Sequence, residues 1–244
     1  MNSEEIAYKA GDTLMKGELY YSEDIKGPKP CILVAHAWMG QDDFARSKAR
    51  SLASLGYVGF AIDLYGNGKV AKTKEEAAAL MSPLFMDRAL LQSRLKAAFD
   101  VACQHPEVDS KKIGAIGFCF GGLAVIELFR SGAEVRGAVS FHAVLGDEQG
   151  GKKAKTVAIA SGIRGSLLMM HGHDDPLVST TDIAKCQKDL TDAHVDWQMH
   201  VFGNTSHAFT VPYSNDKEMG LIFNPLSEKR SWRAMKNFFE EKFR

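Results

Sequence analysis

The stretch Ile113-Gly114-Ala115-Ile116-Gly117-Phe118-Cys119-Phe120-Gly121-Gly122-Leu123-Ala124 decides how this chain folds. An apolar strand pattern runs into Gly-x-Cys-x-Gly, and a helical pattern begins immediately after Cys119. A residue at so sharp a turn is held in a strained backbone conformation, so its neighbours two positions away must be glycine to avoid clashes. We therefore expect Cys119 to project above the carboxyl end of the strand, at the N-terminus of the helix.

This strand–turn–helix pattern is typical of a nucleophile elbow, here with cysteine in place of the usual serine. The helix N-terminus offers unpaired N–H groups and a partial positive charge, which favour a thiolate and stabilise negative charge on a bound carbonyl oxygen. The alternative is a buried structural cysteine in a glycine-rich turn. The preceding strand, the following helix and the additional Gly122 together favour the nucleophile.

Alternating strand and helix patterns surround the elbow. Two segments of polar–apolar alternation predict N-terminal antiparallel strands joined by a turn at residues 10–12. Continuous apolar runs such as Cys31–Ala35 predict strands covered on both faces. The expected strands are 4–9, 13–21, 31–35, 57–62, 112–117, 136–141, 166–171 and 196–202, and the expected helices are 42–55, 73–82, 86–104, one beginning after Cys119, 180–192 and 226–242. This order predicts an α/β fold in which helices flank a mostly parallel central sheet, in a single domain of residues 1–244.

A base and a carboxylate for the cysteine are expected downstream, in the chain order nucleophile, acid, histidine. The buried strand Leu167–Met170 leads into His171-Gly172-His173-Asp174-Asp175-Pro176, and the loop after a strand end is where the acid belongs. Asp175 fits the usual Gly-x-x-Asp loop better than Asp174, which stays open as the alternative. His207 follows the last strand and precedes the last helix, so its imidazole is expected to reach Cys119.

Two backbone N–H groups should face the oxygen of a bound carbonyl group. The first is expected from Phe120, the residue after the nucleophile. The second is expected from Trp38, in the loop His36–Gly40 that follows an early buried strand. Losing one such donor typically lowers the rate by roughly 100- to 1,000-fold.

Composition narrows the possible partners. Thirty basic and 30 acidic residues give a formal net charge of zero, which favours neither nucleic acid nor an anionic membrane surface. The acidic N-terminus Met-Asn-Ser-Glu-Glu does not have the pattern of a signal peptide, and no apolar run is long enough for a membrane span. We therefore expect a cytoplasmic protein, monomeric or homodimeric, whose four cysteines are free thiols.

From about residue 30 to its end the chain resembles the dienelactone hydrolase family. The resemblance is carried by residues 117–122, 56–58, 63–66, 141–142, 172–178 and 207–209, which read GFCFGG, GYV, DLYG, FH, GHDDPLV and HAF. It implies an α/β-hydrolase fold, a triad of Cys119, Asp175 and His207, and hydrolysis of a small-molecule ester or lactone without metal or cofactor.

Two positions differ from the type member of that family. Ala37 stands where the type member has a glutamate that helps to activate the cysteine, and Val211 stands where it has an arginine that binds the carboxylate of the substrate. The differences favour an ester less acidic than dienelactone. Candidates for the wall of the substrate pocket, besides Trp38, are Phe85, Arg88, His142 and Phe209.

Three other interpretations remain open. In the first, His171, His173 and Asp175 bind a metal ion, although Pro176 occupies the position where such a motif normally needs another histidine. In the second, the chain is a hydrolase-shaped binding protein without activity. In the third, the thioester intermediate is intercepted by an acceptor other than water.

Overall fold

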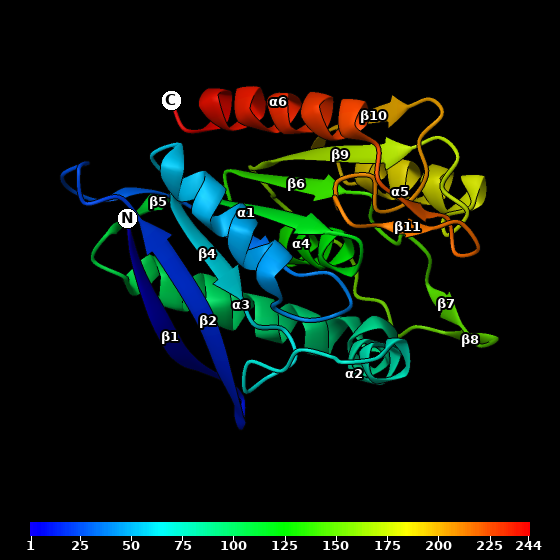
Figure 1. Cartoon of the computed structure of the whole chain (residues 1–244), viewed down its shortest axis with the longest axis horizontal. Helices are drawn as coiled ribbons and strands as arrows, with labels where there is room; N and C mark the ends of the chain where they lie inside the picture. Colours follow the sequence, from blue (N-terminus) through cyan, green and yellow to red (C-terminus); the bar gives the residue numbers. More distant parts are fainter.

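The computed structural model describes residues 1–244, and its centre is a sheet of eight strands (Figure 1). The strands are β1 (Asn2–Ala10), β2 (Thr13–Tyr21), β3 (Lys29–Ala35), β4 (Val58–Ile62), β5 (Val108–Phe118), β6 (Gly137–Phe141), β9 (Ser166–Gly172) and β10 (Asp196–Phe202). Their order in the sheet is β1-β2-β4-β3-β5-β6-β9-β10. The first two strands are antiparallel, β2 also runs antiparallel to β4, and all other pairs are parallel. The predicted mostly parallel sheet with N-terminal antiparallel strands is confirmed.

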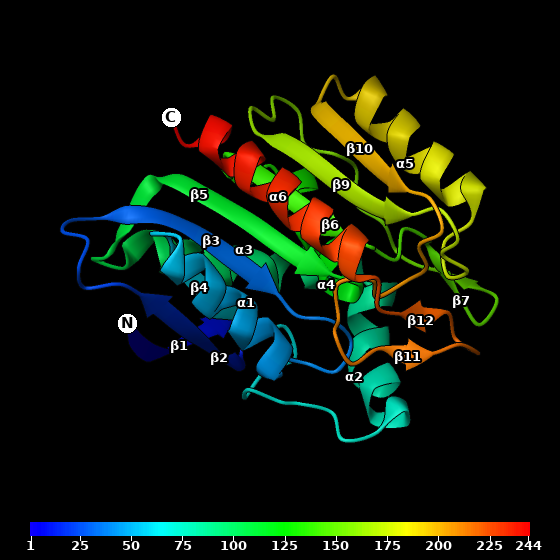
Figure 2. The ribbon, with the colours of Figure 1, turned by 45° about the horizontal axis from the view of Figure 1, so that its top comes forward.

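Six helices flank the sheet. They are α1 (Asp43–Ser54), α2 (Lys74–Met86), α3 (Arg88–Gln104), α4 (Phe120–Arg130), α5 (Thr180–Asp192) and α6 (Pro225–Lys242). Figure 2 shows α1 and α6 lying across one face of the sheet, with α3 and α4 behind the other face. No helix combines the length and the hydropathy that crossing a membrane requires.

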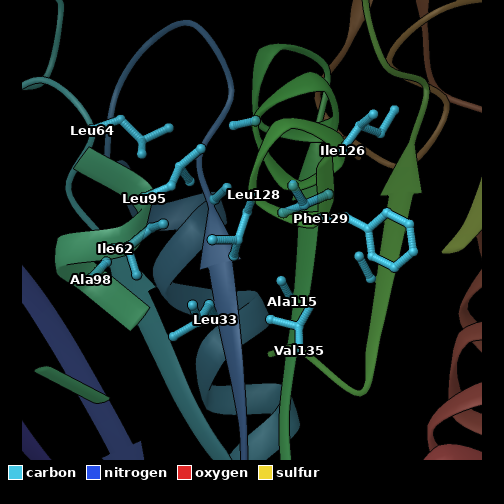
Figure 3. Packing of buried hydrophobic residues seen from close by; sticks show 14 of the residues in the cluster. Leu33, Ile62, Leu64, Leu95, Ala98, Ala115, Ile126, Leu128, Phe129 and Val135 are labelled. Atoms are coloured by element: carbon cyan, nitrogen blue, oxygen red, sulfur yellow. The ribbon is translucent and has the colours of Figure 1, made fainter. Parts of the chain in front are cut away.

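Two hydrophobic cores form because successive side chains of a strand point to opposite faces of the sheet. In β3, Ile32 and Val34 pack with residues of α1 and α6, whereas Leu33 packs toward α3 and α4. Figure 3 shows this second core, which includes Leu95 and Leu128. Both cores are closed to solvent, and each fully buried aliphatic or aromatic side chain stabilises the fold by about 1.5–3 kcal/mol relative to an exposed one.

The helix boundaries follow the capping residues in the sequence. Asp42 accepts the N–H of Ala45 and begins α1, and Asp87 accepts the N–H of Leu90 and begins α3. The expected end of the second helix at residue 82 is wrong. The helix α2 includes Pro83 and continues to Met86, because the N–H of Asp87 bonds to the carbonyl of Pro83 and closes one more turn.

Two short ribbons were not foreseen. They consist of β7 (Glu148–Gln149) with β8 (Lys152–Lys153), and β11 (Asn215–Asp216) with β12 (Leu221–Ile222). Figure 2 places both beyond the carboxyl ends of the parallel strands. Strands of two residues are too short to show an alternating pattern in the sequence. The ribbons shape the loops on the side of the sheet where Cys119 lies.

Gly59 provides a test of how closely α1 packs on the sheet. A Cβ atom at this position would lie 2.1 Å from the carbonyl oxygen of Ala49, which belongs to α1. We expect Gly59→Ala to lower the free energy of unfolding by about 2 kcal/mol or more, because backbone must move. Urea unfolding with an unchanged m-value measures this loss.

The matched control for Gly59→Ala is Gly203→Ala, where a Cβ atom meets no atom within 4 Å. We expect its free energy of unfolding to change by no more than about 0.5 kcal/mol. Equal stability of the two variants would contradict the close approach of α1 to β4.

Candidate active site

Cys119 occupies the sharp turn between β5 and α4. Its backbone angles are φ 56° and ψ −116°, a region that residues other than glycine rarely adopt. The cysteine is partly exposed, whereas its neighbours Phe118 and Phe120 are fully buried. No side chain caps the first turn of α4, so its N–H groups remain free beside the thiol.

Close backbone contacts explain the glycines of the Gly-x-Cys-x-Gly motif. A Cβ atom on Gly117 would lie 1.9 Å from the carbonyl oxygen of Gly121, and one on Gly121 would lie 2.1 Å from the carbonyl oxygen of Ala35. Any side chain at either position would therefore push α4 away from the sheet. The spacing seen in the sequence has a direct steric cause.

His207 and Asp175 form a buried pair at the same edge of the sheet. Nδ1 of His207 lies 2.7 Å from Oδ2 of Asp175, and both side chains are fully buried. The other carboxylate oxygen, Oδ1, accepts the N–H of Leu177 at 2.9 Å. Asp174, the alternative acid, is exposed and makes no such pair. The structure thus joins His207 to Asp175 and leaves Asp174 in solvent.

The second ring nitrogen of His207, Nε2, is buried and has no hydrogen-bond partner. Burial alone would lower the pKa of His207, but the negative charge of the Cys119 thiolate and the hydrogen bond to Asp175 outweigh it and raise the pKa to about 10. The charge of Cys119 is the largest of the causes that raise this pKa. A ring nitrogen without a hydrogen-bond partner is free to take up or release a proton.

One of the two expected oxyanion donors lies at the start of a helix and the other in the loop after β3. Phe120 begins α4, and its ring stacks with that of Tyr65 at 6.3 Å. The carbonyl of Trp38 accepts the hydroxyl of Tyr65 at 2.7 Å. Tyr65 thus contacts both segments that carry the expected donors, and sequence reasoning gave it no role.

The loop that carries Trp38 is fixed further by His36, which is fully buried. Its Nδ1–H donates to the carbonyl of Ala37 at 2.7 Å, and its Nε2 accepts the N–H of Leu64 at 3.2 Å. Burial lowers the pKa of His36, so the ring stays neutral and keeps both bonds. Asp63 organises the adjoining turn by accepting four backbone N–H groups, those of Lys16, Tyr65, Gly66 and Gly68. The sequence feature that could have indicated this turn is an acidic residue followed by glycines directly after a buried strand.

The four expected pocket residues divide into two groups. Phe85 lines a cavity of about 430 Å³ together with Leu177, whose N–H bonds to Asp175. The remaining lining residues are Met81, Val144, Gly146, Asp147, Glu148, Gln149 and Asp182. Arg88 is 2% exposed, stacks on Phe85 and donates from Nη2 to the carbonyl of Gly146, so it supports the wall from behind.

His142 and Phe209, also expected on the pocket wall, have no solvent-exposed surface. Their rings pack against each other with centroids 5.0 Å apart, and His142 lies edge-on to His207 at 5.1 Å. They belong to the protein interior, beneath the edge of the sheet where Cys119, Asp175 and His207 lie. Strand ends can place a side chain above or below the edge, and the sequence pattern does not distinguish the two.

No group of three or more His, Cys, Asp or Glu side chains in residues 1–244 is placed to hold a metal ion. Of the three residues considered for a metal, Asp175 is bonded to His207 and His173 is exposed. His171 is buried, and burial lowers its pKa.

Comparison with known proteins identifies the family. A model of the dienelactone hydrolase family matches residues 15–243. The chain belongs to the dienelactone hydrolase family. Membership makes it a hydrolase of the class that acts on esters and lactones, as the resemblance implied.

Several members of the dienelactone hydrolase family or similar proteins align over most of the chain. A dienelactone hydrolase-like promiscuous phosphotriesterase from metagenomic libraries is 36% identical, with a TM-score of 0.90 over 98% of both chains. A solved protein named m3DLH is 41% identical, also with a TM-score of 0.90 over 98% of both chains. An uncharacterized protein of Caenorhabditis elegans is 30% identical over 63% of this chain and 94% of its own length.

The titration of His207 tests the electrostatics of the site. The thiolate and the carboxylate favour the protonated imidazole, so we expect the ring to stay protonated at neutral pH and to lose its proton only near pH 10. In Cys119→Ala one favourable charge is gone, and the midpoint should move to lower pH. NMR of the ring nitrogens in 15N-histidine-labelled protein measures both midpoints.

His142 serves as the internal control in the same spectra. Burial lowers the pKa of His142 well below its ordinary value, so its ring should stay neutral throughout the titration. A neutral His207 at pH 7 in the unaltered protein would contradict the proposed charge pairing.

Proposed function

We propose that this chain hydrolyses carboxylic esters or lactones, with Cys119 as nucleophile, His207 as general base and acid, and Asp175 as the carboxylate that orients the imidazole. The observation that carries the proposal is the state of His207. One nitrogen is held by Asp175 at 2.7 Å, the other is buried without a hydrogen-bond partner, and the charge of Cys119 is a main cause of the raised pKa of the ring. This division of roles between the two nitrogens is that of a catalytic triad.

In the first half-reaction, the proton of Cys119 resides on His207 and the sulfur attacks the carbonyl carbon. A carbon–sulfur bond forms while the carbonyl electrons move to oxygen, where the N–H groups of Phe120 and Trp38 donate to the oxyanion. When the carbonyl re-forms, the carbon–oxygen bond of the ester breaks. His207 gives its proton to the departing alcohol, and the acyl group remains as a thioester.

In the second half-reaction, water replaces the alcohol. His207 takes a proton from water as its oxygen attacks the thioester carbon, and the oxyanion forms at the same two N–H groups. The carbon–sulfur bond then breaks and releases the acid, which restores the thiolate beside a protonated His207. Asp175 holds the Nδ1–H throughout, so the imidazole keeps one orientation in both halves.

A second candidate activity is the hydrolysis of phosphotriesters. It is favoured by the 36% identity to a protein described as a promiscuous phosphotriesterase, which aligns over 98% of both chains. The same thiolate would attack phosphorus, and the same N–H groups would face the phosphoryl oxygen. Ester hydrolysis remains the primary proposal because it follows from the family as a whole.

The substrate is proposed to lack a carboxylate near the reacting carbonyl. Val211 is apolar and buried, so it offers no charge to an acidic substrate. The charged residues that line the cavity beside Leu177 are Asp147, Glu148 and Asp182, all acidic. Like charges near one another disfavour binding, by about 1 kcal/mol at 4 Å even in water.

Replacing the nucleophile tests the mechanism directly. We expect Cys119→Ala to lower kcat for p-nitrophenyl esters by about 1,000-fold or more, since no thioester can form. The matched control is Cys103→Ala, the same change at a partly buried cysteine on α3, which should keep its activity. Turnover by Cys119→Ala at the unaltered rate would end the proposal.

A substrate panel tests the proposed class. We expect neutral p-nitrophenyl esters to exceed carboxylate-bearing esters of equal length by about 5-fold or more in kcat/KM. Asp147→Asn with Glu148→Gln should narrow that difference, because it removes two acidic groups from the cavity wall. The panel includes a lactone and a p-nitrophenyl phosphotriester. Preference for the anionic esters would overturn the assignment of substrate class.

A further inference from the structure

His142 is a buried, strained residue that the mechanism above does not use. It follows β6 directly and has φ 38°, a left-handed value that non-glycine residues adopt rarely. It has no exposed surface, yet both ring nitrogens are hydrogen-bonded. A core histidine that only filled space would need neither the strain nor the two specific partners.

The hydrogen bonds of His142 fix its tautomer. The N–H of Cys119 donates to Nδ1 at 3.1 Å and also to the carbonyl of Phe141 at 3.0 Å. Because Nδ1 accepts, the ring proton is on Nε2, which donates to Oγ1 of Thr210 at 2.7 Å. Burial, followed by the charge of His207, lowers the pKa of His142 well below its usual range, so this neutral form persists.

The two hydrogen-bond partners of His142 lie on the two segments that carry the proposed nucleophile, Cys119, and the proposed base, His207. Cys119 is the nucleophile itself, and Thr210 lies three residues beyond His207 on the same loop. Thr210 is 2% exposed, so no water competes for its hydroxyl group. The His142 ring also packs edge-on to the His207 ring at 5.1 Å. The imidazole of His142 therefore links the turn that carries the nucleophile to the loop that carries the base.

We propose that His142 is a positioning residue that sets the placement of the His207 imidazole relative to the Cys119 sulfur, through one bond to the elbow and one to the histidine loop. The proposal rests on the proposed function of this site. His142 has no exposed surface with which to reach a substrate, and its hydrogen bonds go to the backbone N–H of Cys119 and to Thr210. Its effect on the reaction comes from geometry, and a shift of about 1 Å between reacting groups can cost about 100-fold in rate.

Substituting His142 by asparagine or by glutamine removes its two hydrogen bonds one at a time. In His142→Asn the side-chain oxygen lies near the position of Nδ1 and can still accept from Cys119, but it is too short to reach Thr210. Asparagine also tolerates a positive φ. In His142→Gln the longer amide reaches toward Thr210 but leaves the N–H of Cys119 with only the carbonyl of Phe141.

The primary experiment compares His142→Asn with Thr210→Val, because both remove the link to the histidine loop. We expect each to lower kcat by about 10- to 100-fold with KM within about 3-fold, and to shift the NMR titration midpoint of His207. The double variant should be no worse than His142→Asn alone, since both changes break the same bond. His142→Gln reports the separate contribution of the bond to the elbow.

Thr205→Val is the matched control. Thr205 is equally buried on the same loop, but its hydroxyl bonds to Gly203, Ser227 and Asn224, away from His142. We expect it to lose stability like Thr210→Val while keeping kcat and the His207 midpoint. If both threonine variants behave alike, or if folded His142→Asn keeps the unaltered kcat and midpoint, His142 has no positioning role.

Alkylation of Cys119 by iodoacetamide, mapped by mass spectrometry, separates this proposal from the proposed function. The reaction needs the thiolate–imidazolium pair but no ester substrate. A slower Cys119 alkylation in His142→Asn and Thr210→Val, but not in Thr205→Val, would support the positioning role even if no ester were hydrolysed. Turnover of esters with alkylation rates unchanged in all three variants would overturn the positioning role and leave the hydrolase proposal intact.

Discussion

The close approach of α4 to the edge of the sheet is the constraint on which the rest of this structure depends. Two carbonyl groups, of Ala35 and of Gly121, occupy the space that side chains on Gly121 and Gly117 would fill. Beside this contact Cys119 is held at a positive φ, where the backbone cost is of order 1–3 kcal/mol. The cost is offset by the packing of both cores, and it fixes the thiol at the edge of the sheet where the histidine and aspartate loops meet.

Two imidazoles lie side by side in this site with opposite proton affinities. Burial acts in the same direction on both His207 and His142, yet the pKa of His207 is raised and that of His142 is lowered. Their partners make the difference. His207 faces a thiolate and a carboxylate, whereas His142 faces a backbone N–H and a hydroxyl group. Such a division of titration between neighbouring groups is consistent with the proposal that His207 transfers protons and His142 serves structure.

The sequence was sufficient for the architecture because the signals were local. Apolar runs such as Cys31–Ala35 and the glycines around Cys119 reflect contacts within one strand or turn, and the fold they predicted is confirmed. The acid and the histidine could be proposed because loops after strands meet at one edge. Whether His142 and Phe209 lie above or beneath that edge depends on packing between distant segments. The Gly-x-x-Asp loop favoured Asp175 over Asp174, and the pairing of Asp175 with His207 in the structure agrees with that preference. The hydrophobic periodicity of the sequence carries no information on such packing between distant segments.

The segment between β6 and β9 indicates where the sequence of this protein can change without disturbing the sheet. Residues 137–141 pair with 166–170 in uninterrupted parallel register, so the chain leaves and re-enters the sheet at fixed points. The intervening segment, with its β7–β8 ribbon, supplies Val144 and Glu148 to the cavity but none of the three residues of the proposed triad. The part of this segment that follows His142 and lines the cavity, with the β7–β8 ribbon, can therefore vary without changing Cys119, Asp175, His207 or His142, and it is the place where evolution or engineering can alter the cavity wall.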